Sequence, residues 1–74
     1  MAKTANVARR VTVNLRASDV ERIEKIAEST GLSANEVIRR ALATESFIVE
    51  NRNQDRKILI EDKDGTVQRV EFLY

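Results

Sequence analysis

The sequence predicts a small, mainly helical homodimer with one short N-terminal strand in each copy and an added C-terminal β-hairpin. Three observations support this fold class. Residues 10–16 alternate between polar and apolar side chains, which is the period of a half-buried strand. Two capping-box patterns, beginning at Ser18 and at Ser33, each precede apolar residues at helical spacing. Near the C-terminus, the pair Asp64-Gly65 separates two strand-like runs.

The strand predicted over residues 10–16 has one apolar face and one polar face. The apolar face carries Val11, Val13 and Leu15, and the polar face carries Arg10, Thr12, Asn14 and Arg16. Because this is the only strand signal in the first two thirds of the chain, its backbone groups have no ladder partner within one copy. The simplest partner is the same strand of a second copy, paired antiparallel across a two-fold axis.

The chain is short for a stable core of its own. It has 74 residues and contains neither Cys nor His, so no disulfide and no Cys/His zinc site can stabilise it. We therefore expect an obligate dimer whose stability depends on concentration, and a monomer that is largely unfolded. Because caps and turns account for the Ser and Thr residues, and no evident base could activate them, we expect no catalytic site and no cofactor.

The apolar residues are too scattered for a membrane protein. No apolar run approaches the roughly 20 residues that a spanning helix needs. The N-terminal residues also lack the apolar core of a signal peptide. We expect a cytoplasmic protein that does not contact a membrane.

Basic residues are concentrated in the N-terminal part of the chain. The net charge is only +1, yet residues 1–18 contain Lys3, Arg9, Arg10 and Arg16 and no acidic residue. A dimer would bring two such segments together, and this local positive charge is typical of surfaces that attract a phosphate backbone. The alternative is a solvated basic tail.

The first helix is predicted to begin at the capping box of Ser18 and Glu21. Its apolar face carries Val20, Ile23, Ile26 and Ala27. Gly31 is predicted to end it, because glycine adopts the left-handed conformation at little cost. Leu32 can then fold back onto the helix end as in a Schellman motif.

The second helix is predicted to begin at the capping box of Ser33 and Glu36 and to end near residue 50. One face carries Val37, Ile38, Ala41 and Leu42, and Arg39 and Arg40 lie outside this stripe as solvated charges. The consecutive residues 47–49, Phe-Ile-Val, cannot share one face. Some of them should therefore pack on the partner subunit or on the C-terminal segment.

The C-terminal residues predict a β-hairpin. The Asp-Gly pair between the two strand-like runs favours either a type I′ turn or a type I turn with a G1 bulge. Asp62, Asp64, Gly65 and Glu71 also match four positions of a calcium-loop pattern. The first ligand position of that pattern is Ile60, however, and both flanks are strand-like, so we expect a turn and no metal site.

The order of these elements resembles the ribbon-helix-helix family of bacterial DNA-binding proteins, the MetJ/Arc/CopG group, and in particular its CopG-like branch. The resemblance covers about residues 10–49. It rests on the stretches Arg10-Val11-Thr12-Val13-Asn14-Leu15, Ile23-Glu24-Lys25-Ile26-Ala27 and Gly31-Leu32-Ser33, and on the spacing of Ile38, Ala41 and Leu42. No single motif is specific for this family, but the occurrence of all of them in this order and at these distances is.

The resemblance implies a dimer whose two strands form a ribbon that enters the DNA major groove, backed by four helices. The base-reading positions fall on Arg10, Thr12 and Asn14, which are residue types able to read base edges. At Asn14 this branch often has a hydroxyl residue. The alternative for Thr12 and Asn14 is an ordinary exposed strand face.

The resemblance also implies phosphate binding at the start of the second helix, at Ser33, Ala34 and Asn35, where free N–H groups and the helix dipole favour anions. Further phosphate-binding candidates are Arg16, Arg9 and Lys3. The predicted dimer core consists of Val11, Val13, Leu15, Ile23, Val37, Ile38 and Leu42.

These expectations divide the chain into a flexible basic arm (1–9), a ribbon-helix-helix DNA-binding domain (10–50), a polar linker (51–56) and a C-terminal β-hairpin (57–74). We expect a dimeric, site-specific repressor that binds double-stranded DNA and could form higher-order assemblies on it. One alternative is an antitoxin that also regulates its own operon, although a compact hairpin argues against it. A second is a dimeric interaction module that binds a protein partner through the hairpin.

Overall fold

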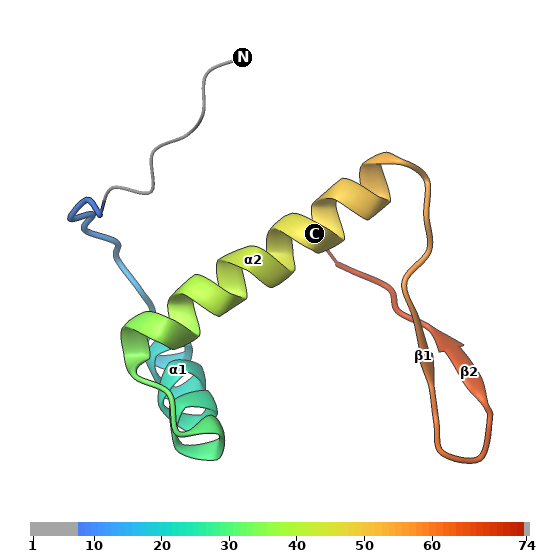
Figure 1. Ribbon diagram of the computed structural model, residues 1–74, viewed down its shortest axis with the longest axis horizontal. Coiled ribbons are helices and arrows are strands. Elements are labelled where there is room, and N and C mark those ends of the chain that lie inside the picture. The colour runs from blue at the N-terminus through green and yellow to red at the C-terminus, as the bar shows by residue number, and fades with distance from the viewer. Residues whose placement is uncertain (1–7, 74) are drawn as a thin grey trace.

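The computed structural model describes residues 8–73, which form two helices followed by a small antiparallel sheet. Helix α1 spans Ala17–Thr30 and helix α2 spans Ala34–Asn53. Strands β1 (Leu59–Glu61) and β2 (Val67–Arg69) pair with each other. Figure 1 shows α1 packed at one end of α2 and the β-hairpin at the other end. The predicted mainly helical fold with a C-terminal hairpin is confirmed.

The beginning of α1 differs from the prediction. The helix starts at Ala17, directly after the extended Arg16, so Ser18 lies inside the helix and is not its N-cap. The Asp19 carboxylate accepts a hydrogen bond from the backbone N–H of Arg16 at 3.2 Å and from the Arg22 guanidinium at 3.0 Å. Because Asp19 satisfies a backbone donor of the first turn, the helix can begin two residues earlier than a Ser18 cap would allow.

The end of α1 follows the prediction for Gly31. This residue has φ +75° and donates its N–H to the carbonyl of Ala27 at 2.8 Å. The N–H of Leu32 does not complete a Schellman motif, because it donates to the hydroxyl of Thr30 at 3.4 Å. That hydroxyl donates in turn to the carbonyl of Ile26 at 2.6 Å. Helix α1 therefore ends with the simpler left-handed cap, supplemented by a threonine side chain.

Helix α2 continues to Asn53, beyond the end expected near residue 50. A Schellman motif ends it, with Asp55 in the left-handed region at φ +57°. The N–H of Asp55 donates to the carbonyl of Arg52, and the N–H of Arg56 donates to the carbonyl of Asn51, both at 3.0 Å. An aspartate can adopt this conformation at lower cost than most residues, which explains why a polar segment without glycine ends the helix.

The hairpin has the predicted Asp-Gly turn. Its paired residues are Leu59 with Arg69, Ile60 with Gln68, and Glu61 with Val67. In the turn, Gly65 donates its N–H to the carbonyl of Asp62 at 2.9 Å, and Asp62 donates its own N–H to the carbonyl of Thr66 at 2.7 Å. Gly65, at φ +89°, is the only turn residue with positive φ. This pattern selects the type I turn with a G1 bulge and excludes type I′, which needs two such residues.

The predicted N-terminal strand is absent from the single chain. Across residues 8–73, β1 and β2 are the only strands, and residues 10–16 have no regular secondary structure. The prediction of a strand at this position is therefore wrong for one copy taken alone. The physical reason is that β1 and β2 are close in sequence and pair with each other, whereas residues 10–16 have no neighbouring strand to accept and donate their backbone hydrogen bonds.

One chain forms almost no hydrophobic core. Val37, 3% exposed, is the only buried residue in the part of the chain that the structure describes. By contrast, Val11 is 75% exposed, Val13 66% and Leu42 65%. Large apolar side chains exposed over most of a short chain indicate that further burial must come from another molecule.

Candidate nucleic-acid interface

The predicted capping box at the start of α2 is confirmed. The hydroxyl of Ser33 accepts a hydrogen bond from the backbone N–H of Glu36 at 3.2 Å, and the Glu36 carboxylate accepts from the backbone N–H of Ser33, also at 3.2 Å. The same hydroxyl donates to the Glu36 carboxylate at 2.9 Å. Hydrogen bonds from the Ser33 hydroxyl and the Ser33 N–H lower the pKa of Glu36, with smaller contributions from the nearby arginine charges.

These hydrogen bonds decide which groups at this helix end can meet an anion. The Ser33 hydroxyl is engaged both as donor and as acceptor. Helix geometry leaves the N–H groups of Ala34 and Asn35 without a carbonyl acceptor inside α2, and the positive end of the helix dipole lies beside them. The Glu36 carboxylate opposes an incoming phosphate, so nearby cations are needed to balance it.

Such cations lie beside the start of α2. An open hollow of about 560 Å³ separates the N-terminal segment from the first turns of α2. Its lining residues are Ala8, Arg9, Arg10, Val11, Asn35, Ile38 and Arg39. The structure thus brings together Arg9 and Arg10, which were predicted to contact DNA, and Asn35 from the predicted phosphate-binding helix end.

Arg39 lines this hollow and is not the isolated solvated charge that the sequence predicts. It joins Arg9 and Arg10 around the hollow because it lies one helical turn after Asn35, on the same side of α2. This four-residue spacing from the predicted helix end is the signal that could have identified it.

The other predicted DNA contacts do not line this hollow. Thr12, Asn14 and Arg16 are exposed. Arg16 is the residue that precedes α1, and its backbone N–H is bound by Asp19. Lys3 lies outside the described residues. The single chain therefore presents the predicted reading side chains to solvent without gathering them at one site.

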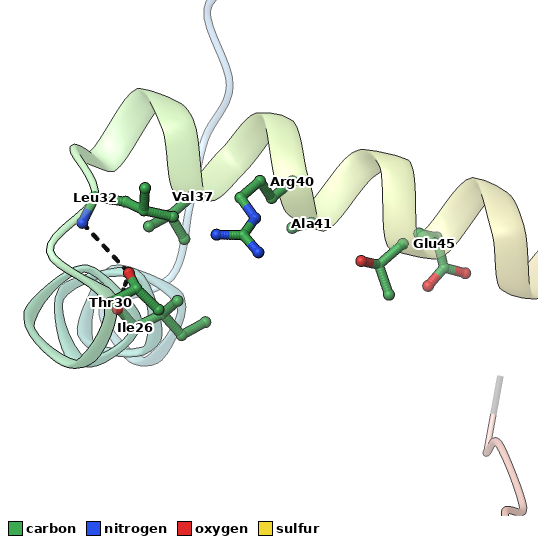
Figure 2. A pocket seen from close by; sticks show the side chains of 8 residues that line it. Ile26, Thr30, Leu32, Val37, Arg40, Ala41 and Glu45 are labelled. Atoms are coloured by element: carbon green, nitrogen blue, oxygen red, sulfur yellow. Dashed lines mark hydrogen bonds between the residues drawn. The ribbon is translucent and has the colours of Figure 1, made fainter. Parts of the chain in front are cut away.

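A second, apolar groove runs between α1 and α2. Figure 2 shows side chains of both helices around it, and its volume is about 360 Å³. The lining residues are Ile26, Thr30, Leu32, Val37, Arg40, Ala41, Thr44 and Glu45. Of the predicted dimer core, only Val37 contributes to this groove.

Most of the remaining predicted core residues are exposed in one copy. Ile23 is half-buried in α1, whereas Ile38 and Leu42 of α2 are exposed. Val49 is also exposed and continues the stripe of Ile38 and Leu42 along α2, since these positions fall on one helix face. This stripe is suited to packing against another apolar surface.

Residues 8–73 contain neither a cluster of metal ligands nor a helix able to cross a membrane. No cluster of three His, Cys, Asp or Glu side chains is arranged to hold a metal ion. In the same residues, neither helix combines the length and the hydropathy needed to cross a membrane.

Comparison with known proteins identifies the family of this chain. A family model described as a ribbon-helix-helix protein of the copG family matches residues 9–45, which is half of the chain. Comparisons with curated proteins and with solved structures gave no match. The matched segment contains the alternating residues 10–16, the Gly31 turn and the Ser33 capping box. Proteins of this family are generally DNA-binding transcription regulators that bind DNA as dimers. The chain belongs to the copG family of ribbon-helix-helix proteins.

Proposed function

We propose that this protein is a dimeric transcriptional repressor that reads the DNA major groove with a two-stranded ribbon, formed by residues 10–16 of both copies. One observation carries the proposal: the alternating apolar side chains Val11, Val13 and Leu15 remain 75%, 66% and 45% exposed in a single chain. Pairing with the same segment of a second copy supplies the missing ladder hydrogen bonds and covers these side chains.

The opposite face of this ribbon carries the proposed reading residues. Arg10 can donate two hydrogen bonds to guanine O6 and N7, and Asn14 can form a bidentate pair with adenine N6 and N7. Thr12 can use its hydroxyl on a base edge or contact a thymine methyl group with its own methyl. In the dimer each side chain occurs twice, so the ribbon reads two half-sites related by symmetry.

Phosphate contacts set the register of the ribbon in the groove. We assign them to the backbone N–H groups of Ala34 and Asn35 at the start of α2, since capping engages the Ser33 hydroxyl in both directions. Arg9 and Arg39 supply positive charge at the same hollow. Arg16 and Lys3 are additional phosphate-binding candidates.

Fluorescence anisotropy tests this function. The ligand is a labelled duplex from the region upstream of the gene that encodes this protein, and a scrambled duplex of the same composition is the control. Wild-type protein and a variant with Arg10, Thr12 and Asn14 all changed to alanine are compared at two salt concentrations. Sedimentation of both proteins first establishes that the variant remains a dimer.

The wild type should prefer the upstream duplex, and both its affinities should fall steeply as the salt concentration rises. The triple variant should lose the preference and keep weak binding to both duplexes, because its phosphate contacts remain. An unchanged preference in the variant would exclude ribbon reading. A wild-type dimer that binds neither duplex would favour the interaction module instead.

A further inference from the structure

The C-terminal hairpin lies outside the segment that matches the family model, which ends at residue 45. It also stands apart from the proposed DNA-binding residues, because it follows the far end of α2 from α1 (Figure 1). Helix α2 has 20 residues, which corresponds to about 30 Å at the helical rise. Residues 57–73 contain four acidic and three basic side chains, so this region has no net positive charge that would attract DNA.

One face of the hairpin is solvent-exposed and has a regular pattern. In the observed register, Leu59 lies opposite Arg69 and Glu61 lies opposite Val67, so these four side chains share a face. We call it the hairpin face. Leu59 is 56% exposed and Val67 51% exposed. The two apolar residues occupy one diagonal of the hairpin face, and Glu61 and Arg69 occupy the other. Arg69 also forms an exposed ion pair at 3.2 Å with Glu71, which follows it closely along the chain, so its guanidinium can contact a further carboxylate only by sharing it.

The other face of the hairpin is partly covered by the same chain. Ile58 and Val70 belong to that face and are half-buried, while Ile60 nearer the turn is exposed. The two half-buried side chains share a hollow with Arg52 and Phe72. The Arg52 guanidinium lies 5.0 Å from the centre of the Phe72 ring, which joins the end of α2 to the last residues of the hairpin. The hairpin face is therefore the more exposed of the two.

We propose that the hairpin face binds the same face of a second copy and thereby joins two dimers. The pattern of the face is self-complementary. A two-fold axis along its apolar diagonal places Leu59 on Leu59 and Val67 on Val67 of the other copy, and it places each Glu61 opposite the other copy's Arg69. The strands then cross at a steep angle, which is one of the two common packings of sheets. A two-fold axis along the charged diagonal would instead bring like charges together.

The contact is isologous, so it closes after two hairpins and does not propagate into a filament. The face is small, so the association is weak between dimers that diffuse freely. It becomes effective where two dimers occupy neighbouring DNA sites, because their hairpins are then held at a high local concentration. This last consequence, cooperative occupation of adjacent sites, rests on the proposed function, whereas the contact itself does not.

Sedimentation velocity of the full chain without DNA tests the contact over a range of concentrations. The variants are Glu61→Arg and Arg69→Glu, each alone and mixed in equal amounts. Each reversal alone places like charges at both charged contacts and should weaken dimer–dimer association by about tenfold. The mixture should restore it, since both charged contacts between one variant and the other then pair a basic with an acidic side chain. Gln68→Arg, on the other face of the same strand, is the matched control and should associate like the wild type.

Rescue in the mixture also controls for folding, because a hairpin that a substitution had unfolded could not regain association by mixing. A wild type that stays dimeric at the highest concentration would overturn the proposal. Single variants that associate like the wild type, or a mixture that fails to recover, would overturn it as well. Dissociation of the single variants into monomers would place the hairpin in the primary dimer interface instead. DNA binding is measured separately, so failure of this contact is distinguishable from failure of the repressor function.

Discussion

The hydroxyl of Ser33 lies 2.9 Å from a carboxylate oxygen of Glu36 and donates a hydrogen bond to it, while accepting one from the Glu36 backbone N–H at 3.2 Å. At the start of α2, Ser33 and Glu36 therefore satisfy each other's hydrogen-bonding groups. Because the carboxylate must be ionised to accept these hydrogen bonds well, the stability of this helix end depends on the charge of Glu36.

We expect a pH-dependent contribution to stability from Glu36. Its pKa is lowered in the folded chain, first by the hydrogen bond from the Ser33 hydroxyl and then by the one from the Ser33 N–H. Folding therefore favours the ionised form. The contribution is fully present above the ordinary glutamate pKa of 4.5 and is lost as the pH falls from there through the lower folded value.

Glu36→Gln removes this titration but keeps a side chain that can cap the helix. In thermal unfolding at a fixed protein concentration, the difference in Tm between wild type and Glu36→Gln should shrink as the pH falls below 4.5. Asp64→Asn at the hairpin turn should show the same trend, because the hydrogen bond from the N–H of Thr66 lowers the pKa of Asp64. A Tm difference for Glu36→Gln that is constant across the acid range would contradict the prediction.

Val13→Asp should abolish the dimer. In the proposed ribbon Val13 faces the core of the dimer, and an unpaired buried charge there costs about 3–5 kcal/mol. Sedimentation should show monomers at concentrations where the wild type is dimeric. Thr12→Asp is the matched control on the neighbouring residue of the polar face: it should remain dimeric and lose DNA binding. A Val13→Asp variant that sediments like the wild type would exclude the ribbon.

Asn14→Ala should reduce affinity for the preferred DNA site by about 1–3 kcal/mol and change binding to scrambled DNA little, because it removes a base-edge contact. Anisotropy titrations on both duplexes measure the two losses. Asn35→Ala is the matched control, since the proposed phosphate contact there uses the backbone N–H and survives the substitution. Equal losses on both duplexes for Asn14→Ala would assign that side chain a role other than reading.

Arg39→Ala should weaken binding to the preferred and the scrambled duplex alike. The side chain lines the basic hollow at the start of α2, and losing one phosphate contact should reduce the slope of log affinity against log salt by about 1. Lys25→Ala removes an equal charge from α1, away from that hollow, and should leave the slope unchanged. If Arg39→Ala has the same slope of log affinity against log salt as the wild type, the guanidinium of Arg39 does not contact a phosphate.

Where the predictions were correct, neighbouring residues decide the structure. Gly31 ends α1, Ser33 and Glu36 cap α2, and the Asp-Gly turn closes the hairpin, each through hydrogen bonds between residues at most four positions apart. The errors at the helix ends arise from competition between local signals. Asp19 provided an earlier cap than Ser18, and Asp55 adopted the left-handed conformation that ends α2 beyond the expected residue.

The two helices, the turn between them and the Asp-Gly turn of the hairpin follow from the amino-acid sequence alone, because the energies that select these features arise between neighbours along the chain. Two other properties depend on the tertiary structure. It placed Arg39 beside Arg9 and Arg10, which depends on how the N-terminal segment meets α2. It also left residues 10–16 without a strand and their apolar side chains exposed, because a strand forms only where a second strand completes its hydrogen bonds.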